Sequence, residues 1–390
     1  TLSSSSAASD VYKRQMHHIS IQSLTYGLTH RTLKASTKVP PIMQALRKTR
    51  PEHGLELLDL PSPASPGAGD VLIRVHATGV CGTDLHIDEW TPSYHFMTAA
   101  LPVTIGHEFS GVVEAIGAGV EDLKLGQLVA VRPSTVCGRC ASCQAGDFDG
   151  CVTRRGIGVA RDGAFAPWVV APARNCLRMP EGVSPEVASL AEPLTVSHEA
   201  VRVGGVRPGD RVLVLGPGNI GQGIALFARD AGASQVVVAG HGDAPRLAVL
   251  RAMGFEHVVD FAESGMQAGL APYLADGPFD VVIEATGAAG VIAPALQALK
   301  PRGVLVITGI HAAPVPIDLA ALVRRHQEIR GSYRAPEANW QQVVDFMERN
   351  HDTLALMITH RVPLAQALEG FALARNKVAT KVVVLPQAGA

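Results

Sequence analysis

The sequence predicts an α/β plus β fold, in which a β-rich region is followed by a doubly wound parallel sheet. Between positions 55 and 170, short β-branched segments alternate with turns, and no long amphipathic helix interrupts them. From Asp210 onward, near-continuous Val, Ile and Leu segments alternate with helical patterns. Such uninterrupted apolar strands are typical of a parallel sheet that helices cover on both faces.

Each expected strand is bounded by turn residues. The clearest strand of the first region, 71–75, follows a Pro/Gly/Ser-rich turn, and the pattern becomes helical near Ser184. In the second region a strand, a glycine-rich turn and a helix at 219–231 follow in direct succession, and a further helix is expected in the tail from Trp340. The expected strands are 55–58, 71–75, 111–116, 128–132, 165–170, 211–215, 235–239, 258–259, 280–284, 304–308 and 381–385.

Composition excludes several classes of protein. The chain has 390 residues and a formal net charge of −1, so it lacks the positive charge expected for binding nucleic acid or an anionic membrane. No apolar run reaches the length of about 18 residues that a membrane span needs. Six cysteines without a secretory segment favour metal binding in the reducing cytoplasm over a disulfide framework.

Residues 1–42 differ from the rest of the chain. They contain a serine run and show no sustained periodicity. The segment 3–15 resembles translated sequencing-adapter sequence, which would make it an artefact and place the biological start at Met16 or Met43. We therefore expect residues 1–42 to form a disordered or artefactual extension.

Four cysteines lie close together in the pattern Cys-x2-Cys-x2-Cys-x7-Cys. They are Cys137, Cys140, Cys143 and Cys151. Four thiolates are what a closed tetrahedral zinc site needs, and at this spacing a single loop can supply all of them. Because such a site has no open coordination position, it should stabilise the fold and take no part in turnover.

A second constellation lies upstream of these cysteines, in a Cys-Gly-Thr-Asp motif and a Gly-His-Glu motif. Catalytic zinc needs a few protein ligands and one position left for substrate or water. Cys81 offers a thiolate and His107 an imidazole. The carboxylate can come from Glu108 or from Glu192, and the residues alone leave this choice open.

The second motif extends into a longer pattern, Gly-His-Glu-x2-Gly-x5-Gly-x2-Val, from Gly106 to Val120. This pattern resembles the zinc signature of the medium-chain zinc-dependent alcohol dehydrogenases, and the resemblance covers about residues 43–386. The resemblance implies a GroES-like catalytic domain and a Rossmann dinucleotide-binding domain. The expected divisions are the extension 1–42, the catalytic domain 43–193 with a structural zinc lobe at 137–151, the Rossmann domain 194–336, and a C-terminal segment 337–390 that returns to the catalytic domain.

The resemblance also implies metal ligands. Cys81, His107 and Glu192 would hold the catalytic zinc, and Glu108 would be the neighbouring carboxylate that can exchange onto the metal. Asp84 would orient the ligand imidazole. Together with the four-cysteine lobe, this implies two zinc ions per chain, and the resemblance further implies a homodimer or homotetramer.

A proton path is implied in the same way. Thr83 would hydrogen-bond the substrate hydroxyl and remove its proton, and His86 would pass this proton through the cofactor ribose to solvent. Such a path agrees with the chemistry of alcohol oxidation, in which zinc lowers the pKa of the alcohol and the cofactor accepts hydride.

The turn after the strand 211–215 fits the pattern G-x-G-x-x-G and opens a helix. Backbone N–H groups at such a turn can face a pyrophosphate, so the turn predicts a dinucleotide site. The residues expected to bind the cofactor at this turn are Gly216, Gly218, Asn219, Ile220 and Gly221.

The end of the second strand of this region, 235–239, departs from the usual NAD pattern. In an NAD site this strand usually ends in Asp or Glu, about 20 residues after the glycine-rich turn, where the carboxylate binds the ribose hydroxyls. The tip reads Gly240-His241-Gly242, and the nearest acid is Asp243. A missing carboxylate removes repulsion against a 2′-phosphate, which His241 or Arg246 can attract, yet no Arg occupies the position that an NADP site usually fills. These residues are cofactor candidates, and the choice between NAD and NADP stays open.

Two motifs resemble two branches of the family. The segment from Cys81 to Trp90 resembles L-threonine 3-dehydrogenases, and the Ala-Glu-Pro-Leu motif at Glu192 resembles sorbitol and polyol dehydrogenases. Both branches oxidise secondary alcohols flanked by polar groups. The aromatic segment that includes Tyr94 and Phe96 is expected to line the substrate cleft, with a surface loop as the alternative.

We therefore predict a zinc-dependent oxidoreductase that transfers a hydride from a secondary alcohol to NAD(P)+ and yields the ketone. One alternative is a zinc-free reductase of the same superfold, and the paired Cys81 and His107 argue against it. The other is a non-catalytic nucleotide-binding protein, which the path from Thr83 to His86 disfavours.

Overall fold

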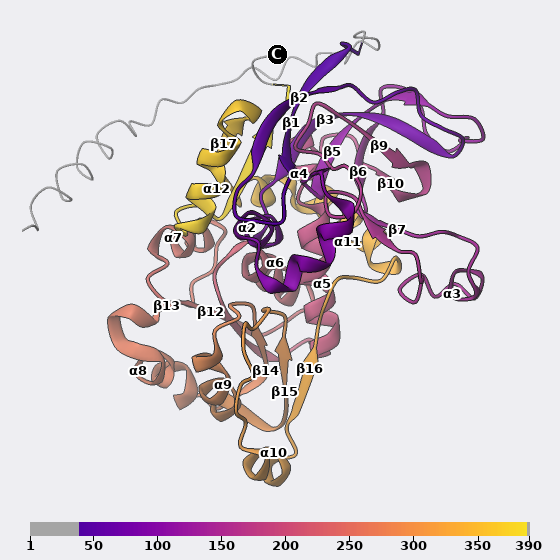
Figure 1. Ribbon diagram of the computed structural model, residues 1–390. Helices are drawn as coiled ribbons and strands as arrows, with labels where there is room; N and C mark the ends of the chain where they lie inside the picture. Colours follow the sequence, from indigo (N-terminus) through magenta and orange to yellow (C-terminus); the bar gives the residue numbers. More distant parts are fainter. Residues whose placement is uncertain (1–38, 388–390) are drawn as a thin grey trace, which may run out of the picture. The chain divides into compact units, whose positions relative to one another are not determined.

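The computed structural model describes residues 39–387. The extension predicted at 1–42 therefore lies outside the described residues, apart from its last four positions. Among residues 39–387, no helix is both long and apolar enough to cross a membrane. The predicted fold class is confirmed: a β-rich part precedes a parallel sheet that carries helices on both faces (Figure 1).

The β-rich part contains three sheets, the largest of seven strands. Most predicted strands are present, but the one expected at 165–170 begins at Trp168, and β3 is twice as long as the predicted 71–75. The seven strands are β10 (Cys176–Arg178), β6 (Leu128–Val131), β5 (Glu108–Ile116), β3 (Asp70–Gly79), β18 (Lys381–Leu385), β17 (Ile358–Pro363) and β9 (Trp168–Pro172). The smaller sheets are β2 (Glu56–Pro61), β1 (Ile42–Lys48) and β4 (Val103–Thr104), and β7 (Ser134–Thr135) with β8 (Arg155–Gly156).

The last strand of the chain, β18, returns to the β-rich sheet and pairs with β3. Val383 lies opposite Gly79, and Gly79 also lies opposite Glu108 at the start of β5. A Cβ atom at position 79 would overlap the Glu108 carboxylate and lie 3.3 Å from Cδ of Lys381. Glycine at this position therefore makes room for two charged side chains between three strands.

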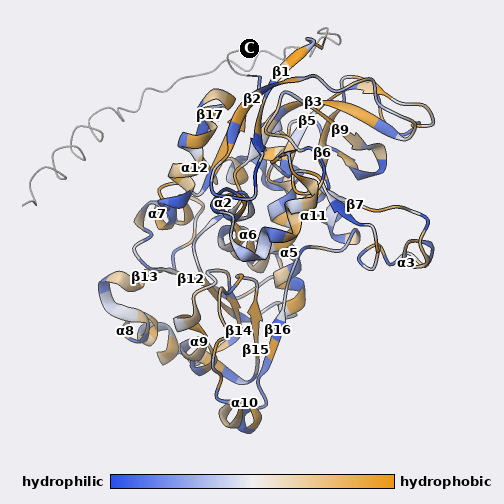
Figure 2. Ribbon diagram, viewed as in Figure 1, coloured by the Kyte–Doolittle hydropathy of each residue, from blue (hydrophilic) through white to orange (hydrophobic). Residues whose placement is uncertain are grey.

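The second part is a six-stranded, fully parallel sheet. Its order is that of a doubly wound dinucleotide-binding fold, with the first strand in the middle. Apolar side chains point to both faces, and β14 and β15 are largely hydrophobic (Figure 2). The strands, in sheet order, are β13 (Val258–Asp260), β12 (Gln235–Gly240), β11 (Arg211–Leu215), β14 (Phe279–Glu284), β15 (Leu299–Ile307) and β16 (Glu328–Gly331).

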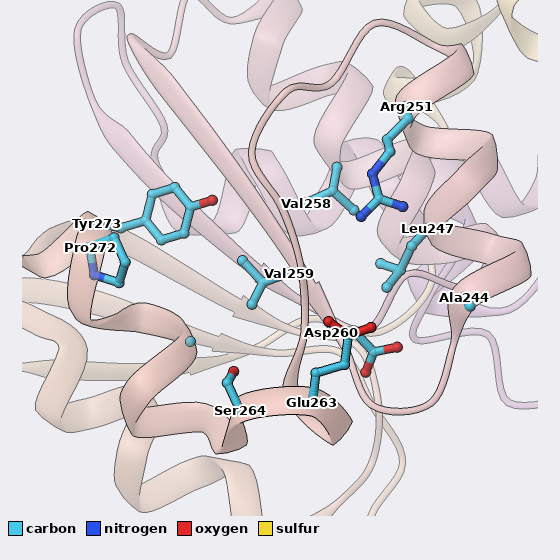
Figure 3. Close-up of a pocket in the computed structure, with 11 residues that line it drawn as sticks. Ala244, Leu247, Arg251, Val258, Val259, Asp260, Glu263, Ser264, Pro272 and Tyr273 are labelled. Carbon is cyan, nitrogen blue, oxygen red and sulfur yellow. The ribbon is translucent and has the colours of Figure 1, made fainter.

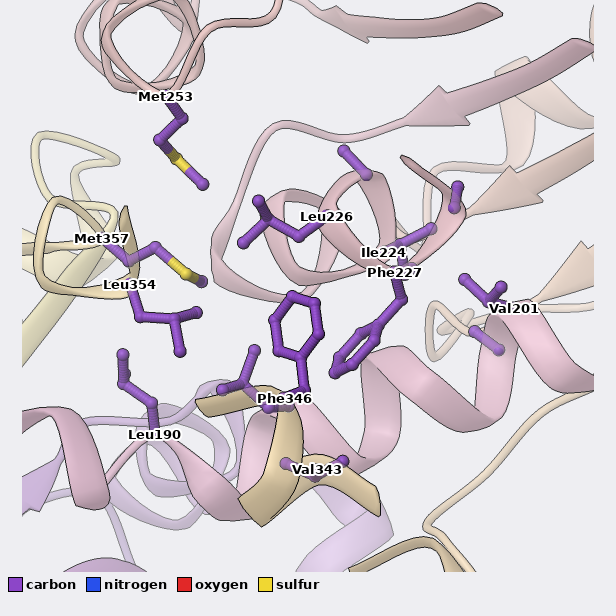
Figure 4. Packing of buried hydrophobic residues seen from close by; sticks show 14 of the residues in the cluster. Leu190, Val201, Ile224, Leu226, Phe227, Met253, Val343, Phe346, Leu354 and Met357 are labelled. Atoms are coloured by element: carbon purple, nitrogen blue, oxygen red, sulfur yellow. The ribbon is translucent and has the colours of Figure 1, made fainter. Parts of the chain in front are cut away.

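Helices cover the two faces of this sheet with separate cores. One core joins the sheet to α5 (Ala191–Gly204), α6 (Asn219–Asp230) and α11 (Ala338–Ala355), and its centre is a pair of aromatic rings, Phe227 and Phe346, with centroids 4.4 Å apart (Figure 4). The other core contains residues of α8 (Phe261–Ala275) and α9 (Ile292–Ala298).

The remaining helices are short. The α-helices are α2 (Gly82–Glu89), α3 (Ala141–Gln144), α4 (Pro185–Ala188), α7 (Ala244–Ala252), α10 (Leu319–Arg325) and α12 (Ala367–Arg375), and the 3-10 helices are η1 (Pro92–Ala100), η2 (Ala173–Asn175), η3 (Ala289–Val291) and η4 (Leu364–Gln366). Sequence periodicity did not reveal α2, because eight residues are too few to show a clear apolar face.

The glycine-rich turn between β11 and α6 is closely packed. Gly216 has a φ of 108°, a conformation that L side chains rarely adopt. A Cβ atom on Gly221 would overlap the carbonyl oxygen of Gly216, whereas a Cβ atom on Gly218 would have only a guanidinium nitrogen at 3.9 Å. The first and third glycines are thus required by packing, and the second is not.

We predict that Gly221→Ala lowers the free energy of unfolding by at least about 2 kcal/mol, because overpacking of a tight site costs about 1–3 kcal/mol. Gly218→Ala is the matched control, with an expected cost under about 1 kcal/mol at this N-cap position. Thermal unfolding of both variants provides the comparison. Equal midpoints would contradict the packing described for the turn.

Candidate active site and structural metal site

Three of the predicted zinc ligands meet where β3 leads into α2. Cys81 is the N-cap residue of α2, His107 directly precedes β5, and Glu108 is the first residue of β5. Since β3 and β5 are paired antiparallel, residues far apart in the sequence come together here. One ligand atom from each of these three side chains lies within 4.8 Å of the others.

Asp84 connects two of these residues. One oxygen of its buried carboxylate accepts a hydrogen bond from the Cys81 backbone N–H at 2.9 Å, and the other lies 3.4 Å from Nδ1 of His107. Burial alone would lower the pKa of His107, but Asp84 and Cys81 raise it well above its usual value. With Nδ1 facing Asp84, the opposite ring nitrogen is the one left for a metal, which is a common arrangement for a ligand histidine.

The two candidate carboxylates differ in their surroundings. Glu108 forms a buried ion pair with Lys381, with 2.6 Å between Oε2 and Nζ, and both side chains are at most 3% exposed. The Lys381 ammonium also donates to the carbonyl oxygen of Val80 at 3.0 Å. The charge of the Glu108 carboxylate is therefore already balanced by the Lys381 ammonium.

Glu192 lies in the first turn of α5, outside the 4.8 Å set. Burial raises the pKa of Glu192 to about 7, against the opposing effect of His107. Within residues 39–387, its carboxylate forms no hydrogen bond or ion pair. Glu192 is thus a carboxylate close to the cluster without a cation of its own.

The four clustered cysteines come together as the sequence predicts. Their sulfur atoms all lie within 4.8 Å of one another, and Cys137 Sγ is 3.8 Å from Cys151 Sγ and 3.9 Å from Cys143 Sγ. The Cys140 backbone N–H points at the Cys137 sulfur, at 3.4 Å. Hydrogen bonding from the Arg139 backbone lowers the pKa of the Cys137 thiol to about 5. Backbone hydrogen bonds also lower the pKa of Cys151, whereas burial raises the pKa of the Cys143 thiol to about 12. Four converging sulfurs, two of which are stabilised as thiolates, fit tetrahedral zinc.

The predicted proton-path residues lie on α2 beside the metal candidates. Thr83 and His86 are three residues apart and so share one side of the helix. Tyr94, from η1, donates a hydrogen bond to Thr83 Oγ1 at 3.0 Å, and its ring stacks on His86 with centroids 5.9 Å apart. The sequence placed Tyr94 in the segment lining the cleft but did not indicate this bond.

Lys381 is the functional candidate that sequence reasoning missed. Its only local signal is a lysine at the start of an otherwise apolar strand, Lys-Val-Val-Val-Leu. This pattern is equally typical of a strand whose first residue is exposed to solvent. Its partner Glu108 lies 273 positions away in the sequence.

The predicted cofactor residues lie at the ends of β11 and β12. Gly218 is the N-cap residue of α6, and Asn219, Ile220 and Gly221 form the first turn of the helix, where backbone N–H groups favour an anion. Asn219 Oδ1 is a buried atom without a hydrogen-bond partner among the described residues. The backbone N–H groups fit a dinucleotide pyrophosphate, whereas Asn219 Oδ1, a hydrogen-bond acceptor, would need a donor such as a hydroxyl group.

The tip of β12 shows why the usual acid is displaced. A Cβ atom on Gly240 would lie 2.8 Å from Pro217 of the glycine-rich turn and 3.0 Å from Asp243. Asp243 is buried at this tip, and its carboxylate accepts a hydrogen bond from the His241 backbone at 3.1 Å. Arg246 lies 3.6 Å from the same carboxylate and donates to the Ala379 carbonyl, while the His241 side chain is exposed.

A separate pocket of about 310 Å³ lies along the edge strand β13, between α7 and α8 (Figure 3). One of its charged lining residues, Asp260, caps α8 by accepting a hydrogen bond from the Ala262 N–H and also accepts one from the Gly242 N–H. None of the predicted site residues lines it. Asp260 is thus engaged in holding the fold, and the pocket lies apart from the predicted site residues, so we assign it no role.

Two family models match the chain. The alcohol dehydrogenase GroES-like domain matches residues 67–181, and the zinc-binding dehydrogenase model matches residues 219–349. The chain belongs to the zinc-dependent medium-chain dehydrogenase family, as the sequence motifs predicted, and it has the two-part fold of that family.

Named relatives extend this similarity over most of the chain. An L-threonine 3-dehydrogenase of Saccharopolyspora erythraea is 36% identical over 344 residues, covering 88% of this chain and 98% of the relative. A sorbitol dehydrogenase of Halalkalibacterium halodurans is 31% identical over 350 residues, covering 88% and 99%. A putative zinc-binding dehydrogenase from Sinorhizobium meliloti, solved with NADP bound, has a TM-score of 0.77 at 30% identity, covering 89% and 100%.

We predict that Lys381→Met lowers the free energy of unfolding of the zinc-loaded protein by about 3–5 kcal/mol, because it leaves Glu108 as an unpaired buried charge. The matched control is Arg50→Met, which removes one side of an exposed ion pair with Glu56 and should cost at most about 1 kcal/mol. Adding Glu108→Gln to Lys381→Met should restore part of the loss. If denaturant unfolding shows no greater loss of unfolding free energy for Lys381→Met than for Arg50→Met, the claim that buried Glu108 needs Lys381 as its partner is contradicted.

Proposed function

We propose that this chain is a zinc-dependent dehydrogenase that oxidises a secondary alcohol of the polyol, diol or hydroxy-amino-acid type to the ketone, with NAD(P)+ as hydride acceptor. The observation that carries the proposal is the convergence of Cys81, His107 and Glu108 within 4.8 Å, with Thr83 two residues after Cys81 in the first turn of α2. The threonine and sorbitol dehydrogenases among the relatives support the substrate class, since both names denote alcohols with polar neighbours.

Charge balance favours Glu192 over Glu108 as the resting third ligand of the catalytic zinc. Glu108 already has the Lys381 ammonium at 2.6 Å, whereas Glu192 forms no direct ion pair within the described part of the chain and is influenced by His107 and Lys381 only from a greater distance. A divalent ion held by Cys81 and His107 would supply one. Bound there, zinc acts as a Lewis acid that lowers the pKa of an alcohol.

The other residues then act on protons and orientation. Asp84 holds the His107 ring and caps α2. Thr83 Oγ1 accepts the proton of the substrate hydroxyl and releases its own hydroxyl proton. That proton would pass through the cofactor ribose to His86, which is exposed one turn further along α2 and passes it to solvent.

The glycine-rich turn is the proposed cofactor site. Gly216, Gly218, Asn219, Ile220 and Gly221 would bind the pyrophosphate, and His241, Asp243 and Arg246 would meet the adenosine ribose. When bound, NAD(P)+ supplies the acceptor for the hydride. The NADP-bound relative supports a nicotinamide cofactor, and Asp243 at the strand tip supplies an acid for a ribose hydroxyl.

We also propose a second, structural zinc ion in the four-cysteine lobe and a homo-oligomeric protein of the cytoplasm. All six cysteines are free thiols, which supports a reducing compartment. We propose a catalytic domain at 43–193 and a Rossmann domain at 194–336, which the family-model matches at 67–181 and 219–349 support. A returning segment at 337–390 is supported by the pairing of β18 with β3.

Metal analysis combined with activity tests the two zinc sites separately. We expect roughly two zinc ions per chain in the wild type and about one in both His107→Ala and Cys140→Ser. His107→Ala should remain folded but lose more than about 100-fold in kcat/KM, because a zinc ligand should matter at least as much as a residue that only orients a ligand. Cys140→Ser should instead unfold at a lower temperature.

His53→Ala, which removes an exposed histidine, is the control for the histidine substitution. Full activity in His107→Ala would contradict the proposed catalytic site. Absence of zinc from the wild type would favour a zinc-free reductase of the same fold.

The substrate class is tested by turnover of the purified protein on polyols, 2,3-diols and L-threonine with NAD+ and with NADP+. We expect ketone formation from at least one secondary alcohol of this set. Simple primary alcohols serve as the comparison. No turnover on any member with either cofactor would contradict the proposed activity and favour a non-catalytic nucleotide-binding protein.

A further inference from the structure

We infer that Tyr94 is a positioning residue that orients both members of the proposed proton path, Thr83 and His86. The inference rests on the proposed function for its kinetic meaning. Its structural content is the hydrogen bond from the Tyr94 hydroxyl to Thr83 Oγ1 at 3.0 Å and the stacking of the same ring on His86, at 5.9 Å and an interplanar angle of 14°. One side chain thus contacts both residues.

The hydrogen bond restricts what Thr83 can do. A threonine hydroxyl has one proton to donate and two lone pairs with which to accept. The phenol of Tyr94 is protonated at neutral pH and occupies one lone pair. Thr83 therefore keeps one lone pair for the substrate hydroxyl and directs its own proton away from Tyr94. Donation from the phenol also polarises the Thr83 O–H bond and makes it a better donor.

Tyr94 reaches this position because the chain reverses sharply after α2. Trp90 adopts a left-handed conformation with φ 55° and ψ 50°, and its N–H is bonded to the last turn of the helix. The N–H of Thr91 also returns to the His86 carbonyl at 3.1 Å, and the Tyr94 N–H bonds to Thr91 at 2.9 Å. The segment therefore folds back alongside α2.

A buried lysine supports this reversal. Lys48 is fully buried, donates to the Asp88 carbonyl at 3.2 Å near the C-terminus of α2, and places its ammonium 5.0 Å from the centre of the Trp90 ring. A cation at the C-terminal end of a helix and over an indole face is favourable in both respects. The ring of His95 also stacks on the ring of Trp90, with centroids 5.4 Å apart. The turn that presents Tyr94 is thus held from two directions.

Two substitutions separate the two contacts. Tyr94→Phe keeps the ring and removes the hydroxyl, and Tyr94→Leu removes both. Tyr273→Phe is the matched control, because it removes the hydroxyl of another partly buried tyrosine that lies in α8. Zinc content and the midpoint of unfolding are measured for every variant.

We expect Tyr94→Phe to lower kcat by about 10-fold, the lower end of what orienting groups contribute, with the KM for the cofactor unchanged. The solvent deuterium isotope effect on kcat should rise, because proton transfer from the substrate becomes slower relative to the hydride step. Tyr94→Leu should lose more than Tyr94→Phe, and Tyr273→Phe should match the wild type. Wild-type values of kcat and isotope effect in Tyr94→Phe, or a loss that follows lost zinc, would overturn the inference.

A second measurement does not depend on turnover. In protein labelled at histidine, the ring signal of His86, assigned with His86→Gln, should shift in Tyr94→Leu and stay in place in Tyr273→Phe, because the shielding by the stacked ring is lost. An unshifted His86 signal would overturn the positioning role. If the wild type oxidises no alcohol but this signal shifts, the proposed function fails while the positioning of His86 stands.

Discussion

A buried ion pair between Lys381 and Glu108 is the interaction on which the arrangement of the candidate active site depends. It joins the last strand of the chain to the strand that carries the Gly-His-Glu motif, and both side chains are almost completely buried. A buried charge without a partner is strongly unfavourable, so the position of β5 with Glu108 depends on that of β18 with Lys381, and the reverse. Pairing of β18 with β3 brings the Lys381 ammonium to the Glu108 carboxylate of the candidate metal cluster. Gly79, opposite both strands, supplies the space for the pair.

The same pair sets the charge balance around the proposed catalytic metal. Cys81, Asp84, Glu108 and Glu192 bring four potential negative charges to one region, while Lys381 supplies one positive charge. A divalent cation would offset most of the remainder, which is a physical reason why this cluster suits zinc. The four-cysteine lobe solves a different problem, because its sulfurs come from one loop and need no distant strand.

Much of the fold could be predicted because its signals are local. The strand at 211–215 and the start of the helix after it were predicted as they are found, since an uninterrupted apolar run followed by glycines is distinctive. Segments whose partners are distant were less clear: β1 was not predicted, and the strand expected from 165 begins at 168. The four clustered cysteines were found from their spacing, and the other metal candidates from their motifs and the resemblance that these carry. Lys381 and the bond from Tyr94 arise from tertiary contacts that no local pattern encodes.

Anomalous diffraction at the zinc edge from crystals of the full chain tests the central claim most directly. The account predicts two peaks per chain, one bonded to the four clustered cysteines and one bonded to Cys81 and His107, with the Glu108 carboxylate still paired to Lys381. A chain with no peak at Cys81 and His107, or with Lys381 turned away from Glu108 when the metal is bound, would contradict it.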